Sequence, residues 1–336
     1  MRILIFEFVT GGGLIEQPLP PSLLQEAYLM RNALMDDLSA IPTVELLVLQ
    51  DYRVAMPYYA NLQCLRIEQG TVLTHYLHEV QDLYDAVWLI APETEGILLA
   101  WCRFFSAQAK PLCTAAEVAV ALCQDKLQTI QCLNQAGIAC VPTQRYSTSV
   151  PAQGHWVLKN NHSVGCDEVY LLQSAQDWQT VSAQLKEGND YIIQPYIVGQ
   201  AMSLSCLFAD GKAYFICCNE QHVQVEQRQF ILHACTVHVQ AERASAYQQL
   251  CAAIAAAMPD LFAYVGIDFM LTETGECLVL EINPRLTSSY AGIKAALGIN
   301  VAAEVLRLMN NELPILTKTR ERAVHIAINK GVPHAR

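Results

Sequence analysis

The stretch GIDFMLTETGECLVLEINPR, residues 266–285, decides the fold of this chain. Apolar and polar residues alternate on both sides of Thr274-Gly275, which is the pattern of a β-hairpin with a two-residue turn. With that turn, the apolar pairs on one face are Ile267 with Ile282, Phe269 with Leu280, and Leu271 with Leu278. One buried apolar face of this kind fixes the register of the two strands.

The same register brings two acidic side chains together. Asp268 faces Glu281, so their Cβ atoms are expected about 4.5–5.5 Å apart. Asn283 lies two residues beyond Glu281, hence on the same side, and the Gly266 opposite leaves space. Carboxylates this close repel each other, and a divalent cation removes that penalty. Mg²⁺ prefers oxygen ligands, so the pattern predicts a metal site. The alternative is an exposed face with two solvated carboxylates.

The rest of the chain shows two different patterns of strand and helix signals. The first third alternates strand and helix signals, which predicts an open parallel α/β sheet. From residue 155 onward, short strands around a helix indicate an α+β module. We expect an N-terminal α/β domain over 1–113, a second region over 114–310 and a C-terminal tail over 311–336. The expected strands are 2–9, 44–49, 86–91, 155–159, 168–172, 191–197, 202–208 and 213–220. The expected helices are 20–38, 71–83, 93–107, two within 114–136, 175–186, 243–258, 291–297 and 301–309.

Composition excludes several classes of function. The 336-residue chain is 53% hydrophobic, with a formal net charge of -11, so broad nucleic-acid binding is not expected. The sequence has no run of 18 apolar residues, so no membrane span is expected. The apolar start is interrupted by Glu7, which indicates a first strand rather than a signal peptide. Thirteen scattered cysteines without a C-x-x-C spacing are typical of a reduced protein, so we expect a cytoplasmic location.

The hairpin resembles the signature of the ATP-grasp superfamily, an Asp on one strand and Glu-x-Asn on the next. The resemblance implies that Asp268, Glu281 and Asn283 hold Mg²⁺, with Mn²⁺ as an alternative, against the phosphates of ATP. It also implies a catalytic role for Arg285, which would stabilise phosphate or acyl-phosphate oxygens.

The resemblance covers roughly residues 115–310. It implies a small nucleotide-covering lobe at about 140–197 and a metal-binding lobe at about 198–310. The segment before them fits the usual preceding pre-ATP-grasp domain of the family.

Two lysines fall where the family binds ATP phosphates. Lys126 follows Asp125 at a helix start, although an ordinary capped helix explains that pair equally well. Lys159 ends a short apolar strand, and the resemblance makes it both an ATP ligand and a catalytic cation. The loop 160–167 would cover the phosphates. Its only glycine is Gly165, a nucleotide-contact candidate, whereas family loops are usually glycine-rich.

The segment YIIQPYIVG, residues 191–199, resembles the hinge that holds adenine between the lobes. The resemblance assigns nucleotide contacts to Gln194, Tyr196 and Ile197. The family often has Glu at the position of Gln194, and a Glu that contacts ribose is replaced by Ala201. An ordinary buried strand explains the segment equally well.

The whole chain is similar to a narrower group, the ATP-grasp enzymes related to tyramine–glutamate ligase of methanofuran biosynthesis. The similar stretches are FEFVTGGG at 6–13, residues 24–27, LIAPETEGIL at 89–98 and EINPRLTSSYAGI at 281–293. The implied reaction joins the γ-carboxylate of glutamate to a tyramine-like primary amine through an acyl phosphate and releases ADP. A small carboxylate and an amine would be the binding partners, and the superfamily is compatible with a homodimer.

Each candidate substrate contact also has a purely structural explanation. Gly11–Gly13 follow the first strand where open α/β sheets bind ligands, or they form a simple turn. Glu93 and Glu95 would attract an ammonium group, or favour a helix start. Thr287–Ser289 would bind a carboxylate, or cap a helix.

Three rival functions also fit the sequence. They are a D-alanine–D-alanine type ligase, a carboxylase that forms carboxyphosphate, and a nucleotide-binding sensor with a decayed active site.

Overall fold

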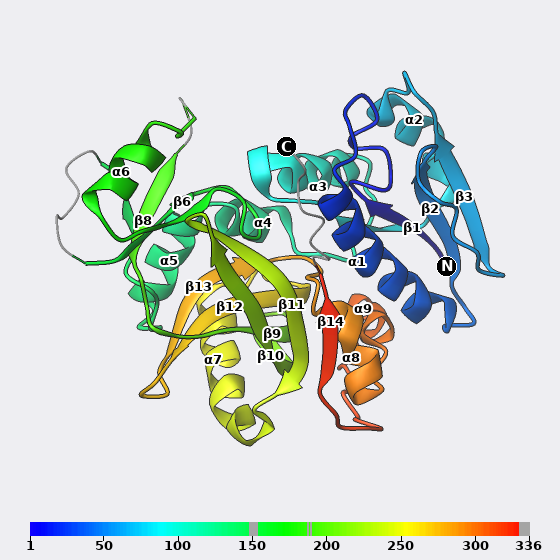
Figure 1. Ribbon diagram of the computed structural model, residues 1–336. Helices are drawn as coiled ribbons and strands as arrows, with labels where there is room; N and C mark the ends of the chain where they lie inside the picture. Colours follow the sequence, from blue (N-terminus) through cyan, green and yellow to red (C-terminus); the bar gives the residue numbers. More distant parts are fainter. Residues whose placement is uncertain (148–153, 187, 189, 329–336) are drawn as a thin grey trace.

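The computed structural model describes residues 1–147, 154–186, 188 and 190–328, and these form two sheets with helices packed around them (Figure 1). The end of the expected tail, 329–336, and residues 148–153 of the expected small lobe lie outside the described residues.

The N-terminal part is the parallel α/β domain that the sequence predicts. Its four-stranded sheet has the order β3-β2-β1-β4, with all neighbours parallel. The strands are β1 (Arg2–Glu7), β2 (Glu45–Asp51), β3 (Leu62–Ile67) and β4 (Ala86–Ile90), and the helices are α1 (Pro21–Ser39), α2 (Leu73–Glu79) and α3 (Ile97–Ala107), with short 3-10 turns η1 (Gln81–Leu83) and η2 (Thr94–Gly96). Strand β3 was not predicted. It lies at the sheet edge and is only partly buried, so its apolar signal is weak.

Two helices and a small lobe follow. They are α4 (Glu117–Cys123), α5 (Lys126–Gln135), β5 (Gln144–Arg145), β6 (Trp156–Asn160), β7 (Val169–Leu172), α6 (Ala175–Ser182) and β8 (Tyr191–Pro195). The lobe has a core of its own around Leu158, Leu172 and Val181. In Figure 1 the small lobe lies at the upper left, on the opposite side of the molecule from the N-terminal sheet.

The large lobe carries the predicted hairpin. Its elements are β9 (Gly199–Ala209), β10 (Lys212–Glu226), β11 (Gln229–Val239), η3 (Ala241–Arg243), α7 (Ala244–Ala257), β12 (Ala263–Thr272), β13 (Cys277–Asn283), α8 (Tyr290–Leu297), α9 (Val301–Met309) and β14 (Val324–Ala327). Strands β11 and β14 were not predicted. Because β14 pairs with β11, part of the expected tail is a strand of the large sheet.

The β10–β11 hairpin joins the two lobes. The Leu171 amide donates to the Arg228 carbonyl at 2.7 Å, and Gln229 pairs with Tyr170 of β7. The Arg228 guanidinium also bonds Asp177 of α6. The sheets of both lobes are therefore continuous through this hairpin tip.

The register of the β12–β13 hairpin is partly different from the prediction. Gly266, Ile267 and Asp268 face Asn283, Ile282 and Glu281 as expected, but Phe269 faces Val279 and Leu271 faces Cys277. The turn contains three residues ending at Gly275, whose φ of 84° is left-handed, which is the usual three-residue loop. A bulge at Leu280 restores the expected register before the acidic pair.

All thirteen cysteines, each within the described residues, are free thiols. Burial raises the pKa of most of them, for example that of Cys235 to about 12, so these thiols are protonated and unreactive.

Within the described ranges no helix has the length and apolarity needed to cross a bilayer.

Candidate active site

The predicted acidic pair faces one side of the hairpin. Asp268 and Glu281 are direct cross-strand neighbours. The Asn283 amide donates to Asp268 Oδ2 at 3.2 Å, and Gln221 of β10 donates to Asp268 Oδ1 at 3.0 Å. Burial, and then the charge of Glu281, raise the pKa of Asp268 to about 8. The expected repulsion between the two carboxylates is therefore present.

The space expected at Gly266 is occupied. A Cβ placed there would lie 2.6 Å from Cγ2 of Thr287, so this prediction was wrong. The missing side chain lets the Thr287 segment close over β12 instead of opening a cavity.

Two buried lysines face the acidic pair. Lys126 Nζ lies 3.2 Å from Glu281 Oε2. Lys126 begins α5 because Asp125 caps that helix by accepting from the Gln128 amide at 2.9 Å. Burial lowers the pKa of Lys159 to about 8, an effect that Glu281 partly offsets. Burial would raise the pKa of Glu281, but attraction to both lysines outweighs it and holds that pKa below its usual value. The arrangement leaves two cations beside two carboxylates in a desolvated site.

The loop 160–167 is fixed by side chains. The fully buried Asn161 accepts from the Leu127 amide at 2.9 Å and donates to Asp125 and Asp190 at 2.9 and 3.0 Å. Lys126 Nζ donates to the Ser163 carbonyl. Side-chain bonds thus hold the loop against the start of α5, where the glycine-rich loops of the resembled family would rely on backbone flexibility.

Asn161→Ala is expected to destabilise the protein by about 2–3 kcal/mol, because it leaves the buried Leu127 amide without its acceptor and removes one donor from each of two carboxylates. Thermal and urea unfolding measure this loss. His162→Ala is the control, since its ring is partly exposed and makes one strong bond, to the Gln124 carbonyl. Equal stability of the two variants would contradict the locking role of Asn161.

The hinge candidates lie at the end of β8. Gln194 is buried and donates to Thr143 Oγ1 at 2.7 Å, so its side chain is engaged within the lobe. Tyr196 is exposed, and its ring lies 6.5 Å from that of Phe230 in β11. Ile197 follows it and is partly buried, and Gly165 of the covering loop is exposed with a φ of 59°.

Sequence reasoning missed an apolar floor beside the acidic pair. Met270 lies two residues after Asp268, hence on the same face. It pairs with Leu278 on one side and with Ala201 of β9 on the other. Both longer side chains are partly buried. Side chains alternate along a strand, so the sequence predicts that Met270 lies on the face of Asp268. The bulge at Leu280 changes which residue faces Met270, so the position of Leu278 could not be predicted.

Arg285 is held by the N-terminal domain. Its Nε and Nη2 both lie 2.9 Å from Glu93 Oε2, and Nη1 donates to the Leu286 carbonyl at 3.0 Å. Ser288 donates to Glu26 of α1. Two carboxylates of the N-terminal domain, those of Glu26 and Glu93, are therefore hydrogen-bonded to side chains that follow β13 in the chain.

Two family models match adjoining parts of this chain. A pre ATP-grasp 3 domain matches residues 44–120, and an ATP-grasp domain matches residues 123–289. The chain belongs to the ATP-grasp superfamily. It is 23% identical to tyramine–L-glutamate ligase from Methanocaldococcus fervens over 312 aligned residues. The alignment covers 92% of this chain and 94% of that protein.

Solved ATP-grasp structures have the same fold. An ATP-grasp superfamily protein from Archaeoglobus fulgidus aligns with a TM-score of 0.72 at 18% identity, over 97% of this chain and 92% of that one. The biotin carboxylase domain of 2-oxoglutarate carboxylase from Hydrogenobacter thermophilus, solved with MgADP, ADP and bicarbonate, aligns with a TM-score of 0.70 at 11% identity, over 96% and 72%. At these identities the likeness concerns the fold alone.

The ATP-grasp hairpin has the donor set of a hard cation. Its three candidate ligands offer carboxylate oxygens and, at Asn283, an amide oxygen whose nitrogen is already bonded to Asp268. Oxygen donors of this kind suit Mg²⁺. Among the described residues no group of three or more His, Cys, Asp and Glu is arranged for a metal, which is consistent with a set whose third member is an amide.

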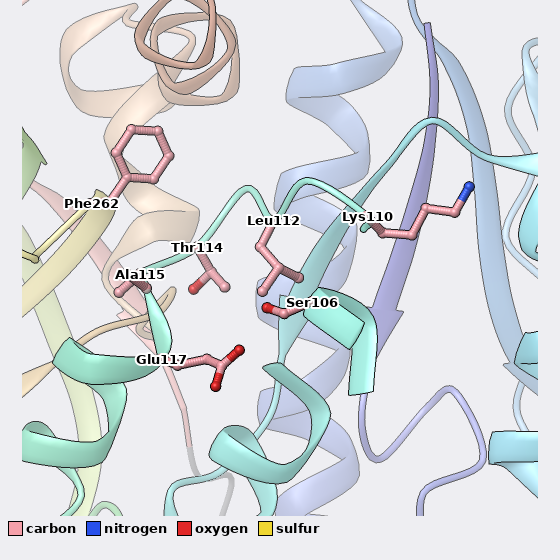
Figure 2. Close-up of a pocket in the computed structure, with 8 residues that line it drawn as sticks. Ser106, Lys110, Leu112, Thr114, Ala115, Glu117 and Phe262 are labelled. Atoms are coloured by element: carbon pink, nitrogen blue, oxygen red, sulfur yellow. The ribbon is translucent and has the colours of Figure 1, made fainter. Parts of the chain in front are cut away.

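Two cavities among the described residues lie away from the acidic pair of this ATP-grasp chain. One of about 350 Å³ lies between the end of α3, the start of α4 and Phe262 (Figure 2). Another of about 480 Å³ lies between the covering loop and the η2 turn, where Glu95 and His162 line it. Neither is lined by Asp268, Glu281 or Asn283.

The triple glycine has a packing reason. A Cβ on Gly11 would lie 2.6 Å from the Glu7 carbonyl, and one on Gly13 would lie 2.3 Å from the Phe8 ring. The buried Glu7 carboxylate accepts from the Val9 and Thr10 amides, so the loop folds tightly on β1. This supports the turn interpretation over a ligand-binding loop.

Proposed function

We propose that this protein is an ATP- and Mg²⁺-dependent carboxylate–amine ligase that works through an acyl phosphate. One observation carries the proposal: Lys126 and Lys159 converge on the face of Asp268 and Glu281, beside an arginine held at the end of the same hairpin. Such a set of fixed charges suits a transferring phosphoryl group.

In the proposed reaction a substrate carboxylate oxygen attacks the γ-phosphorus of ATP, and ADP leaves. Lys126 and Lys159 would bind the phosphates, and Arg285 would orient the acid. A cation at Asp268, Glu281 and Asn283 would screen charge between the phosphates. The amine nitrogen then attacks the acyl carbon, phosphate leaves, and the nitrogen loses a proton. The fixed loop 160–167 would exclude water from the acyl phosphate.

Glutamate and a tyramine-like primary amine are the substrates we propose, because the curated relative that aligns over 92% of this chain is a tyramine–L-glutamate ligase. The product would be the γ-glutamyl amide. This assignment would place the chain in methanofuran biosynthesis or a reaction of the same type.

The proposal is tested by measuring ADP release from MgATP with panels of acids and amines, followed by mass spectrometry of the products. We expect release only when an acid and an amine are both present, with glutamate and tyramine among the best pairs. Turnover with bicarbonate and no amine would indicate a carboxylase instead, and D-alanine alone as both substrates would indicate a D-alanine–D-alanine type ligase. Tight MgATP binding without turnover on any pair would favour a sensor.

A further inference from the structure

The position of Arg285 depends on a residue 192 positions away in the chain. Glu93 follows β4, at the carboxyl edge of the N-terminal sheet, whereas Arg285 follows β13. One carboxylate oxygen, Oε2, receives both Nε and Nη2 at 2.9 Å, and the two side chains are only 5% and 11% exposed. With the bond to the Leu286 carbonyl, three of the five guanidinium N–H groups have partners. The other two have no partner among the described residues.

Glu93 also keeps an oxygen without a partner. Its Oε1 is sealed from solvent and has no hydrogen-bond donor among the described residues. A buried carboxylate oxygen in this state is costly, so packing stability alone does not explain a glutamate here.

We propose that Glu93 is a positioning residue: it fixes the guanidinium plane of Arg285 toward the substrate carboxylate and the transferred phosphoryl group, so that the site is complete only with the N-terminal domain in place. The inference rests on the proposed ligase function. A guanidinium binds carboxylate or phosphate in a planar, two-bond geometry. Without Glu93, Arg285 would keep its charge and lose its orientation.

The positioning role predicts which kinetic constants change. Replacing Glu93 should lower kcat/KM for the acid by about 10- to 100-fold, the usual effect of removing a residue that orients a site ligand. The KM for ATP should change less than threefold, because Lys126, Lys159 and the hinge are untouched.

The experiment is a double-mutant cycle of Glu93→Ala and Arg285→Ala. Glu93→Gln is added because its amide oxygen still accepts from Arg285, so it keeps the fold if Glu93→Ala does not. Asp82→Asn is the matched control, since Asp82 is an exposed carboxylate in the η1 turn before β4. The readouts are kcat/KM for the acid and, without turnover, the calorimetric affinity for inorganic phosphate in the presence of MgADP.

A positioning residue acts through Arg285. We therefore expect Glu93→Ala to lower both readouts in the native background, to add less than twofold once Arg285 is absent, and to be partly rescued by Glu93→Gln. Independent, multiplicative effects, or a Glu93→Gln variant that is no better than Glu93→Ala in both readouts, would overturn the positioning role. Phosphate binding that depends on both residues, in a protein that turns over no acid–amine pair, would contradict the ligase proposal and keep the positioning role.

Discussion

Glu281→Gln is expected to lower Mg²⁺-dependent turnover by on the order of 100-fold or more, with the fold preserved. Glu281 faces Asp268 and bonds Lys126 at 3.2 Å, so it links the proposed cation site to a proposed phosphate ligand. Glutamine has nearly the same shape but no charge, and one neutral amide oxygen is a weaker ligand for a hard cation. The loss should be largest at limiting Mg²⁺.

The stability of this variant should change by less than about 1 kcal/mol, because lost attraction to Lys126 and relieved repulsion with Asp268 oppose each other. Steady-state ADP release over a Mg²⁺ titration, together with thermal unfolding, measures both effects. Glu276→Gln is the matched control, as Glu276 is an exposed carboxylate on the same hairpin. Unchanged activity of Glu281→Gln at low Mg²⁺ would remove this residue from the metal site.

The sequence predicted the acidic pair correctly for a reason that is visible in the structure. The apolar pair of Ile267 and Ile282 is buried as expected, and a buried face specifies register strongly. The predicted turn and the predicted pairs next to it were wrong, because the loop has three residues instead of two. The bulge at Leu280 compensates for the extra residue, so the register is as predicted again at the acidic pair. Local alternation cannot reveal two compensating irregularities.

The contacts between domains could not be predicted from sequence patterns. Glu93 and Arg285 are 192 residues apart, and no periodicity connects a residue after β4 with one after β13. Likewise, the polar residues of loop 160–167 are a departure from a glycine-rich pattern when only the sequence is considered. The bonds of Asn161 to Asp125 and Asp190 give that departure a physical reason.

Lys159→Met is expected to weaken MgATP binding by about 10- to 100-fold, the effect of losing one charge-assisted contact of about 1.5–3 kcal/mol. Lys159 is the last residue but one of β6, beside the loop that would cover the phosphates, and it lies near Glu281 and Lys126. Methionine fills a similar volume without a charge. Calorimetry with a non-hydrolysable ATP analogue and Mg²⁺ measures the change, and Lys212→Met on the exposed start of β10 is the control.

The same substitution should raise the stability of the ligand-free protein by about 1–3 kcal/mol. Burial lowers the pKa of Lys159 to about 8 from 10.5, so a charged lysine costs folding free energy at neutral pH that an apolar side chain does not. A residue that opposes folding and favours nucleotide binding has a functional reason for its position. Lower stability together with unchanged nucleotide affinity would instead make Lys159 a structural partner of Glu281 and Asp268.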